Sequence, residues 1–475
     1  MRRFRSDLLI DGEWIETSKK VRVLDPSDGT VLAEVSLSDE LLELRAIDAA
    51  DRVAKEWANT APRIRAEILR KSFEIMQERI DEIAEIISLE NGKVLSDAKG
   101  EALYAAEFFR WFSEEAVRIN GEYRSSPSGD KRIIVMHQPI GVSLLITPWN
   151  FPAAMATRKL GPALAAGCTV ILKPASETPL TTLAIVEIML EAGLPAGVVN
   201  VILPEKVGTS IAKLIENPKL KNISFTGSTH VGKILLRQAA ERVTRCSMEL
   251  GGNAPFLVLS DANIDDSVAG AVLAKMRNGG AACTAANRFY VHESIADEFI
   301  EKFSDAVRSL KVGPGLELGT QIGACVSIAE RDKIANLVSA SLAEGAELKV
   351  GGSSPDLNGA FYTATVLVVE ASNSILTHEI FGPVAPVVVV RSEEEAIELA
   401  NRSTAGLISY VYSQDLARAL RVGGELESGM VAINRGVVSD PAAPFGGVKE
   451  SGLGREGGFD GIYEFLEKKY IGVDA

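Results

Sequence analysis

The chain has 475 residues and a net charge of −14, with 50 lysines and arginines against 64 aspartates and glutamates. Its 46% hydrophobic and 24% charged residues are typical of a soluble globular protein, and they exclude a disordered chain and a disulfide-stapled miniprotein. The acidic balance argues against nucleic acid and anionic membrane surfaces as partners, and the length corresponds to two or three domains at about 150 residues each.

The N-terminus and the cysteines favour a reducing cytoplasm. The basic start is followed only by a short apolar run at 8–10, and no stretch reaches the roughly 20 apolar residues of a membrane helix. We therefore expect neither a signal peptide nor a membrane partner. The cysteines and the four histidines are widely separated, so we expect no disulfide framework and no metal site; the cysteines are Cys168, Cys246, Cys283 and Cys325.

The first 120 residues are predicted to form an N-terminal segment followed by helices. An alternating run at 8–16 precedes a turn at Pro26-Ser-Asp-Gly29. Helical patterns then cover 63–90 and 94–118, and a strand is expected at 131–136 after a polar stretch.

From residue 141 onward, apolar runs of strand length alternate with helical segments. This alternation predicts βαβ units and a parallel sheet covered by helices on both faces, with ligands bound at the carboxyl ends of the strands. The predicted strands are 142–148, 169–173, 198–203 and 223–226, and the predicted helices are 153–166, 179–192, 207–217 and 229–243.

A second α/β set begins after the paired glycines of Leu250-Gly-Gly252, where we expect a hinge. Its predicted helices include 295–309 and 329–344. Its predicted strands are 255–259, 287–292, 362–369, 384–390, 407–412 and 430–433.

Three polar residues at strand ends or loops are candidates for chemistry. Cys283 stands among small residues that leave its sulfur open to a ligand, as a nucleophile requires, although a buried structural cysteine is the alternative. Glu249 follows apolar residues that would raise its pKa and suit a general base, unless it caps backbone amides. Asn150 could donate to an oxyanion or simply serve the turn before Pro152.

A fourth candidate segment joins a strand to a helix at Phe225-Thr-Gly-Ser-Thr-His-Val-Gly232. Glycine at such a junction lets backbone N–H groups approach a phosphate at the helix N-terminus. The G-x-x-x-x-G spacing differs from the G-x-G-x-x-G fingerprint, so by itself it indicates a cofactor only weakly.

These segments follow one another in the order seen in the aldehyde dehydrogenase superfamily, which the sequence resembles over nearly the full chain. Within that superfamily, the sequence most resembles the succinate-semialdehyde dehydrogenases. The closer match rests on 156–168, 249–256 and 443–447. The segments that carry the family resemblance are Pro148-Trp-Asn-Phe151, Lys173-Pro-Ala-Ser176, Phe225-Thr-Gly-Ser228, Glu249-Leu-Gly-Gly252, Cys283, Glu379-Ile-Phe-Gly-Pro383, Pro444-Phe-Gly-Gly447 and Ser451-Gly-Leu-Gly-Arg-Glu-Gly457.

The resemblance implies a two-step oxidation of an aldehyde. Cys283 attacks the aldehyde carbon, Asn150 and the N–H of Cys283 hold the oxyanion, hydride leaves to a nicotinamide, and Glu249 activates the water that hydrolyses the thioester. A protein that keeps the fold without turnover is the alternative of a different class.

The resemblance also implies a set of cofactor-binding residues. Lys173 and Ser176 are expected at the adenosine ribose, Gly227 and Ser228 at the pyrophosphate, and Glu379 at the nicotinamide ribose. Trp149, Gly232, Leu250 and Phe381 complete the cofactor-binding set.

We favour NADP, with NAD still possible. Relatives that prefer NAD often carry Glu at position 176, which would repel a 2′-phosphate, whereas Ser176 removes that repulsion and Lys173 can pair with the phosphate. The neighbouring Glu177 would restore the repulsion if it turned inward.

The resemblance implies a small aldehyde substrate whose distal carboxylate is bound by Arg158, Arg277 and Ser439. Succinate semialdehyde is the substrate that we favour. For each arginine the alternative is a surface or interdomain salt bridge. Glutarate semialdehyde or an aromatic aldehyde is the alternative substrate, because one methylene is worth only about 1–3 kcal/mol in a pocket.

The chain departs from the family pattern beside the nucleophile. The family commonly has Gln where this chain has Ala281, which puts the packing of this loop in question. Some relatives carry a second cysteine where this chain has Ala285, so we expect no redox disulfide switch here.

The resemblance implies an α/β fold, aldehyde-dehydrogenase-like, of two Rossmann-type domains and a small β oligomerisation arm. The NAD(P)-binding domain is expected at 1–116 and 137–250, and the catalytic domain at 251–440. Residues 117–136 and 441–475 are expected to form the oligomerisation arm and C-terminal segment of a homodimer or homotetramer.

Overall fold

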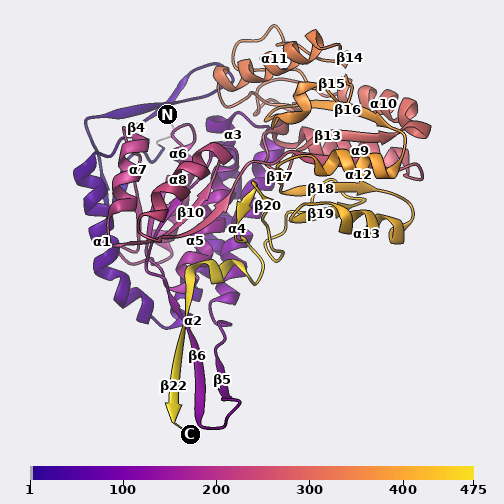
Figure 1. Cartoon of the computed structure of the whole chain (residues 1–475). Helices are drawn as coiled ribbons and strands as arrows, with labels where there is room; N and C mark the ends of the chain where they lie inside the picture. Colours follow the sequence, from indigo (N-terminus) through magenta and orange to yellow (C-terminus); the bar gives the residue numbers. More distant parts are fainter. Residues whose placement is uncertain (1–3, 475) are drawn as a thin grey trace.

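The computed structural model describes residues 4–474 and shows two helix-covered sheets with a narrow ribbon projecting from one of them (Figure 1). Residues 1–3 and 475, which the predicted domain limits include, lie outside the described residues. No helix within 4–474 is both long and apolar enough to cross a membrane.

The N-terminal segment forms two antiparallel hairpins and four helices. The hairpins are β1 (Leu8–Ile10) with β2 (Glu13–Ile15), and β3 (Lys20–Leu24) with β4 (Val31–Ser36). The helical pattern predicted over 63–90 forms two helices, which are separated at Arg79, with a φ of −110° and a ψ of 20°. The helices are α1 (Glu40–Asn59), α2 (Pro62–Glu78), α3 (Ile80–Asn91) and α4 (Leu95–Glu115).

The first sheet is parallel except at one edge, in the order β21-β11-β10-β7-β8-β9. The chain runs outward on one side from β7 to β9 and then returns to build the other side from β10. The strand order therefore reverses between β7 and β10, and such a switch point opens a crevice for a ligand. The strands are β7 (Val142–Ile146), β8 (Val170–Lys173), β9 (Val199–Val201), β10 (Leu220–Thr226), β11 (Arg245–Glu249) and β21 (Gly452–Leu453).

Helices cover both faces of this sheet, as the alternating pattern predicts. Pro152 and Pro179 stand in the first turn of their helices, where a missing N–H costs nothing. The helices between the strands are α5 (Pro152–Ala166), α6 (Pro179–Glu191), α7 (Val207–Glu216) and α8 (Thr229–Ala240).

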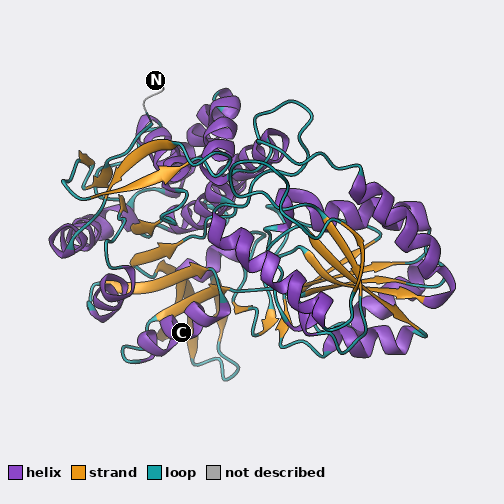
Figure 2. Ribbon diagram, turned by 90° about the horizontal axis from the view of Figure 1, so that it is seen from above, coloured by secondary structure: helices purple, strands orange, loops and turns teal. Residues whose placement is uncertain are grey.

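The second sheet has the order β14-β15-β16-β13-β12-β18-β19 and is parallel except for β14. Its strands are β12 (Ala254–Val258), β13 (Ala286–His292), β14 (Glu347–Val350), β15 (Thr365–Val368), β16 (Val384–Val390), β18 (Ile408–Tyr412) and β19 (Met430–Ile433). Figure 2 shows helices on both sides of it; they are α9 (Ile264–Met276), α10 (Glu293–Arg308), α11 (Ile328–Ala343), α12 (Glu393–Asn401) and α13 (Leu416–Glu425).

The projecting ribbon is a three-stranded antiparallel sheet in the order β22-β6-β5 (Figure 1). It joins β5 (Glu122–Ser125) and β6 (Lys131–Pro139) to the C-terminal strand β22 (Leu466–Asp474). The strand predicted at 131–136 is the first part of β6. Both edge strands, β5 and β22, leave backbone groups free to pair with another strand.

Short elements complete the chain. They are the pair β17 (Ala405–Gly406) with β20 (Val448–Lys449), and the 3₁₀ turns η1 (Arg277–Gly280), η2 (Ser374–Thr377) and η3 (Gly461–Phe465).

Candidate active site

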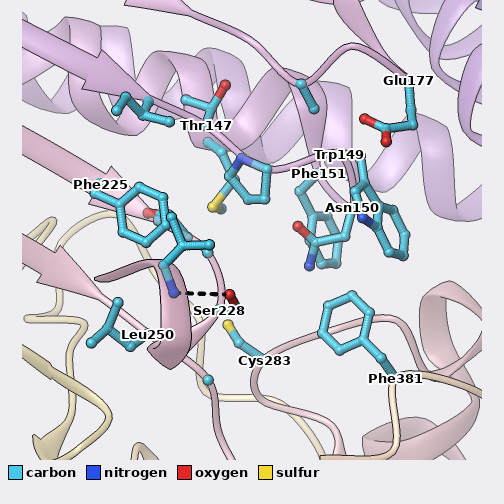
Figure 3. Close-up of a pocket in the computed structure, with 18 of the residues that line it drawn as sticks. Thr147, Trp149, Asn150, Phe151, Glu177, Phe225, Ser228, Leu250, Cys283 and Phe381 are labelled. Carbon is cyan, nitrogen blue, oxygen red and sulfur yellow. Dashed lines mark hydrogen bonds between the residues drawn. The ribbon is translucent and has the colours of Figure 1, made fainter. Parts of the chain in front are cut away.

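A cavity of about 1070 Å³ lies between the two sheets, at the carboxyl ends of the first sheet's strands. Its walls come from the turn after β7, the end of β8, the β10–α8 junction, the loop after β11 and the segment that follows η1. Of the fifteen residues predicted for the site, thirteen line this cavity. The other two are Glu249, which ends β11 immediately before the lining residue Leu250, and Gly232, which lies in the first turn of α8. In Figure 3, Phe225 and Leu250 face Trp149 and Phe381 across it.

Cys283 lies on the segment after η1, and its sulfur points into the cavity (Figure 3). Two glycines allow this placement. Gly280 has a φ of 75°, in the left-handed region, and a Cβ at Gly252 would collide with the carbonyl oxygen of Cys283. By contrast, Cys168 is fully buried and donates its thiol to the carbonyl of Phe465, as a structural cysteine would.

The surroundings of Cys283 hold its sulfur as a thiol. Burial raises the pKa of the Cys283 thiol to about 12, and the nearby guanidinium groups of Arg158 and Arg277 offset only part of that rise. The nucleophile is therefore accessible but protonated at neutral pH, and its deprotonation has to be coupled to catalysis.

Asn150 lies in the turn between β7 and α5, next to the segment that carries Cys283. Its side-chain Nδ2 donates to the carbonyl of Ala281 at 3.0 Å. Because a side-chain amide has two N–H donors, the second can serve an oxygen bound beside Cys283. The main-chain oxygen of Asn150 accepts from Lys93 Nζ at 2.7 Å and from Asn278 Nδ2 at 3.1 Å.

Glu249 ends β11 and is almost fully buried, at 2% exposure. Neither carboxylate oxygen has a hydrogen-bond partner within residues 4–474, so the alternative of a capping carboxylate is wrong. Burial and the nearby Glu456 raise the pKa of Glu249, and Lys159 and Arg158 oppose that rise. A buried carboxylate with free lone pairs is placed to take a proton from water.

The sequence motifs do not assign a role to Lys159 and Glu456, yet both lie beside Glu249. Lys159 Nζ bonds to Glu456 Oε1 and donates to Ser224 Oγ at 2.9 Å. Their interaction joins residues 297 positions apart in the chain, so neither spacing nor periodicity could reveal it. Glu456 stands within the Ser451–Gly457 motif and Lys159 within the segment 156–168, and these two resemblances are the sequence signals for the pair.

The cavity has features that suit a dinucleotide. Ser228 caps α8 by accepting from Val231 N at 3.4 Å, so the helix N-terminus with its free N–H groups opens at the cavity. Lys173 ends β8 at 8% exposure, and its ammonium has no hydrogen-bond or ion-pair partner within 4–474. Burial lowers the pKa of Lys173, opposed by Glu177, and an anionic ligand would restore the balance.

Glu379 also lines the cavity, and its Oε1 accepts from the N–H of Gly252 at 3.0 Å. Burial raises the pKa of Glu379 to about 7, while that hydrogen bond and Lys275 lower it. Trp149 and Phe381 meet edge to face, with ring centroids 5.2 Å apart. Leu250 fills the space that a Cβ at Gly232 would need, so this glycine allows α8 to pack closely.

The two predicted substrate arginines differ in their contacts. Arg277 lines the cavity, and within 4–474 its guanidinium has no hydrogen-bond or ion-pair partner, only the ring of Phe151 at 5.5 Å. Arg158 is buried, donates to Tyr104 Oη at 3.0 Å and lies 3.5 Å from Glu456. The salt-bridge alternative therefore describes Arg158 in part. Ser439 lines the same cavity.

A comparison with protein families matches residues 14–471 to the aldehyde dehydrogenase family. The chain belongs to this family. The membership confirms the family resemblance drawn from the motifs and the α/β fold class that it implies.

Curated relatives cover nearly the whole of this aldehyde dehydrogenase. A succinate-semialdehyde dehydrogenase of Paenarthrobacter nicotinovorans is 52% identical over 90% of this chain and 95% of its own. The NADP(+) succinate-semialdehyde dehydrogenase GabD of Escherichia coli is 45% identical over 98% of both chains. A glutarate-semialdehyde dehydrogenase of Pseudomonas aeruginosa is 44% identical over 98% of this chain and 97% of its own.

Solved structures share the fold of this aldehyde dehydrogenase. The crystal structure of an E. coli NADP-dependent enzyme superposes with a TM-score of 0.98 at 44% identity, covering 99% of this chain and 98% of that one.

A small cavity lies beside Ala281, the position at which this aldehyde dehydrogenase departs from the family pattern. A space of about 20 Å³ is bordered by Ala281, Lys93, Trp149 and Phe381. Asn150 contacts the main-chain oxygen of Ala281, which any residue at this position would provide. The alanine at this position therefore keeps the contact to Asn150.

Proposed function

We propose that this aldehyde dehydrogenase oxidises succinate semialdehyde to succinate, with NADP as the preferred cofactor. The observation that carries the proposal is Arg277, a guanidinium in the wall of the Cys283 cavity with no acidic partner within 4–474. An unpaired arginine beside a nucleophile suits a short substrate with a carboxylate at its far end. The names of the first two relatives above agree with this substrate.

The first step is covalent. Cys283 releases its thiol proton to solvent, the Sγ thiolate adds to the aldehyde carbon, and the resulting oxyanion accepts from Asn150 Nδ2 and the N–H of Cys283. Bound NADP⁺, held by Lys173, Ser176, Gly227, Ser228 and Glu379, supplies the hydride acceptor that the oxidation requires. A free aldehyde lacks such an oxyanion until the sulfur has added, which is why a nucleophile is needed.

The second step is hydrolysis of the thioester on Cys283. Glu249 takes a proton from water as the water oxygen attacks the thioester carbon, and the sulfur leaves as thiolate. The buried pair of Lys159 and Glu456 lies next to Glu249 and sets its charge environment.

Replacing Arg277 by alanine tests the substrate. We expect kcat/KM for succinate semialdehyde to fall about 100-fold, the effect of losing one charge-assisted hydrogen bond, while kcat/KM for butanal changes only a few-fold. The measurement is steady-state NADPH formation with both aldehydes. Equal losses on the two substrates would remove the carboxylate role.

The same panel separates the alternatives. Glutarate semialdehyde also has a distal carboxylate and is named for one relative above, and a benzaldehyde tests the aromatic alternative. We expect kcat/KM to be highest for succinate semialdehyde, with glutarate semialdehyde lower by about 10-fold for its extra methylene. A preference for glutarate semialdehyde would reassign the substrate within the same mechanism.

The cofactor preference has its own test. Ser176 is half-buried, and Glu177 lines the same cavity but is exposed to solvent, which weakens its repulsion of a 2′-phosphate. We expect kcat/KM to favour NADP⁺ over NAD⁺, and Ser176→Glu to shift that ratio toward NAD⁺ at least about tenfold. A wild-type preference for NAD⁺ would overturn the assignment of NADP.

The proposal extends to assembly and compartment. The arm formed by β5, β6 and β22 has two open edges, so we propose that copies of the chain pair through it into a dimer or tetramer. Sedimentation of the purified chain as a monomer alone would contradict this.

All four cysteines are free thiols, which suits a reducing cytoplasm.

A further inference from the structure

We propose that Lys93, with Glu101 and Asn278, forms a positioning site that sets Asn150 against the segment carrying Cys283. This inference rests on the proposed function in one respect, the oxyanion role of Asn150. None of the three residues belongs to the motifs that identify the family or to the predicted site. They act through Asn150 and do not include the nucleophile or the general base.

The ammonium of Lys93 is the centre of this site. Lys93 immediately precedes Val94, the N-cap of α4, and its side chain is 1% exposed. Nζ donates to Glu101 Oε2 at 2.6 Å and to the main-chain oxygen of Asn150 at 2.7 Å, and it lies 4.3 Å from the ring centre of Phe151. One buried cation therefore contacts two consecutive residues of the β7–α5 turn.

Glu101 ties the same turn to α4 from the other side. Its Oε2 pairs with Lys93, and its Oε1 accepts from Ala153 N at 2.8 Å and Ala154 N at 3.3 Å, at the start of α5. Phe151, the residue before α5, offers no side-chain cap. A carboxylate from a distant helix thus satisfies the first N–H groups of α5, where negative charge is favoured.

Asn278 makes the corresponding contacts from the nucleophile side. Its side-chain Nδ2 donates to the main-chain oxygens of Asn150 at 3.1 Å and Ala281 at 2.9 Å. Its backbone N–H donates to Asp97 Oδ2 at 2.7 Å, which holds η1 against α4. Asn278 has a φ of 57°, a left-handed conformation that asparagine tolerates better than most residues.

These contacts form a closed arrangement around Asn150. Lys93 and Asn278 hold its main-chain oxygen, and the oxygen of Ala281 holds its side-chain amide at 3.0 Å. The turn after β7 has no regular secondary structure to fix it. The position of the amide N–H relative to Cys283 is therefore set by two residues that lie far apart in the chain, Lys93 just before α4 and Asn278 in η1.

A buried Lys–Glu pair stabilises the folded state no better than apolar side chains of the same volume would. Taking both charges out of water costs several kcal/mol, and apolar residues of the same volume often serve stability as well. What apolar residues cannot do is donate to the carbonyl of Asn150 and accept from the N-terminus of α5. The pair therefore contributes orientation at a site where small displacements are costly to the rate.

A double-mutant cycle between Lys93→Met and Asn150→Ala tests the inference. Lys93→Met is expected to slow the pre-steady-state burst of NADPH about 10- to 100-fold, as expected for a misplaced oxyanion donor, with Kd for NADP⁺ nearly unchanged. If Lys93 acts through Asn150, the double variant should be no slower than Asn150→Ala alone. Lys93→Arg should recover part of the rate.

The matched control is Lys99→Met, in the helix α4 that follows Lys93. Lys99 pairs with Asp81 at the surface, with both side chains more than half exposed. Its replacement should leave the burst and Kd within error of wild type. Should Lys93→Met fail to fold, Asn278→Asp serves in the same cycle, because it keeps the size of the side chain and removes the donor that faces Asn150.

The outcomes separate this inference from the proposed function. A multiplicative loss in the double variant, or a loss in Kd equal to the loss in rate, would overturn the positioning role. Full activity of Asn150→Ala would instead overturn the oxyanion role of Asn150, and the positioning role with it. A slow Asn150→Ala beside an unimpaired Lys93→Met would leave the proposed function intact and reject only the positioning site.

Discussion

Cys283→Ala is expected to abolish aldehyde oxidation, with kcat falling by a factor of about 10⁵ or more, as for the loss of a nucleophile elsewhere. Without Sγ no thiohemiacetal forms, and so neither the oxyanion contact to Asn150 nor the thioester exists. The measurement is the NADPH burst in a single turnover, which should be absent. Cys246→Ala, which changes a half-buried cysteine of β11, is the matched control and should keep the burst.

The resting state of Cys283 gives this prediction a pH dependence. Since the pKa of the Cys283 thiol is raised to about 12, the thiolate is a small fraction at neutral pH and grows as pH rises. Alkylation of the cofactor-free enzyme by iodoacetamide should therefore accelerate with pH across the neutral range. Rapid alkylation that reaches a plateau below pH 7 would contradict a protonated resting nucleophile.

Glu249→Gln is expected to separate the two steps. The burst should persist, because Cys283 and Asn150 are untouched, while steady-state turnover falls about 10²- to 10⁴-fold with the loss of the general base. Wild-type turnover should also fall as pH drops through the raised pKa of Glu249, because only the carboxylate accepts a proton. Glu241→Gln, at an exposed position, is the control.

The order of effects is the decisive part of this second prediction. Burst and turnover falling together in Glu249→Gln would mean that Glu249 acts before the thioester forms, or that it only supports the fold. An unchanged steady state would assign the activation of water to another group. Glu456 would be the first candidate, because its charge acts on Glu249.

Local chemistry in the sequence predicts where most of the site lies. The strands expected at 384–390 and 430–433 are β16 and β19 to the residue, because short apolar runs between turn or polar residues are typical of strands. The break at Arg79 escaped the pattern, since the apolar period continues through it and no proline or glycine marks it. The pattern also does not predict α1.

Contacts between distant residues are what the sequence does not reveal. Glu249 is expected to be a buried carboxylate from its neighbours, but Lys159 and Glu456 come to its side only through folding. The same holds for Lys93, whose ammonium reaches Asn150 across 57 positions. Arg158 illustrates the same point, because its place in the cavity is predicted and its pairing with Glu456 is not.

The most direct test of the account is to trap the covalent intermediate. Glu249→Gln mixed with NADP⁺ and succinate semialdehyde should accumulate a succinyl thioester, seen by mass spectrometry on the peptide that contains Cys283. The account predicts one adduct per active site, absent in the double variant with Cys283→Ala and strongly reduced by Arg277→Ala. A full burst of NADPH without an adduct on Cys283, or an adduct that forms equally well without Arg277, would contradict it.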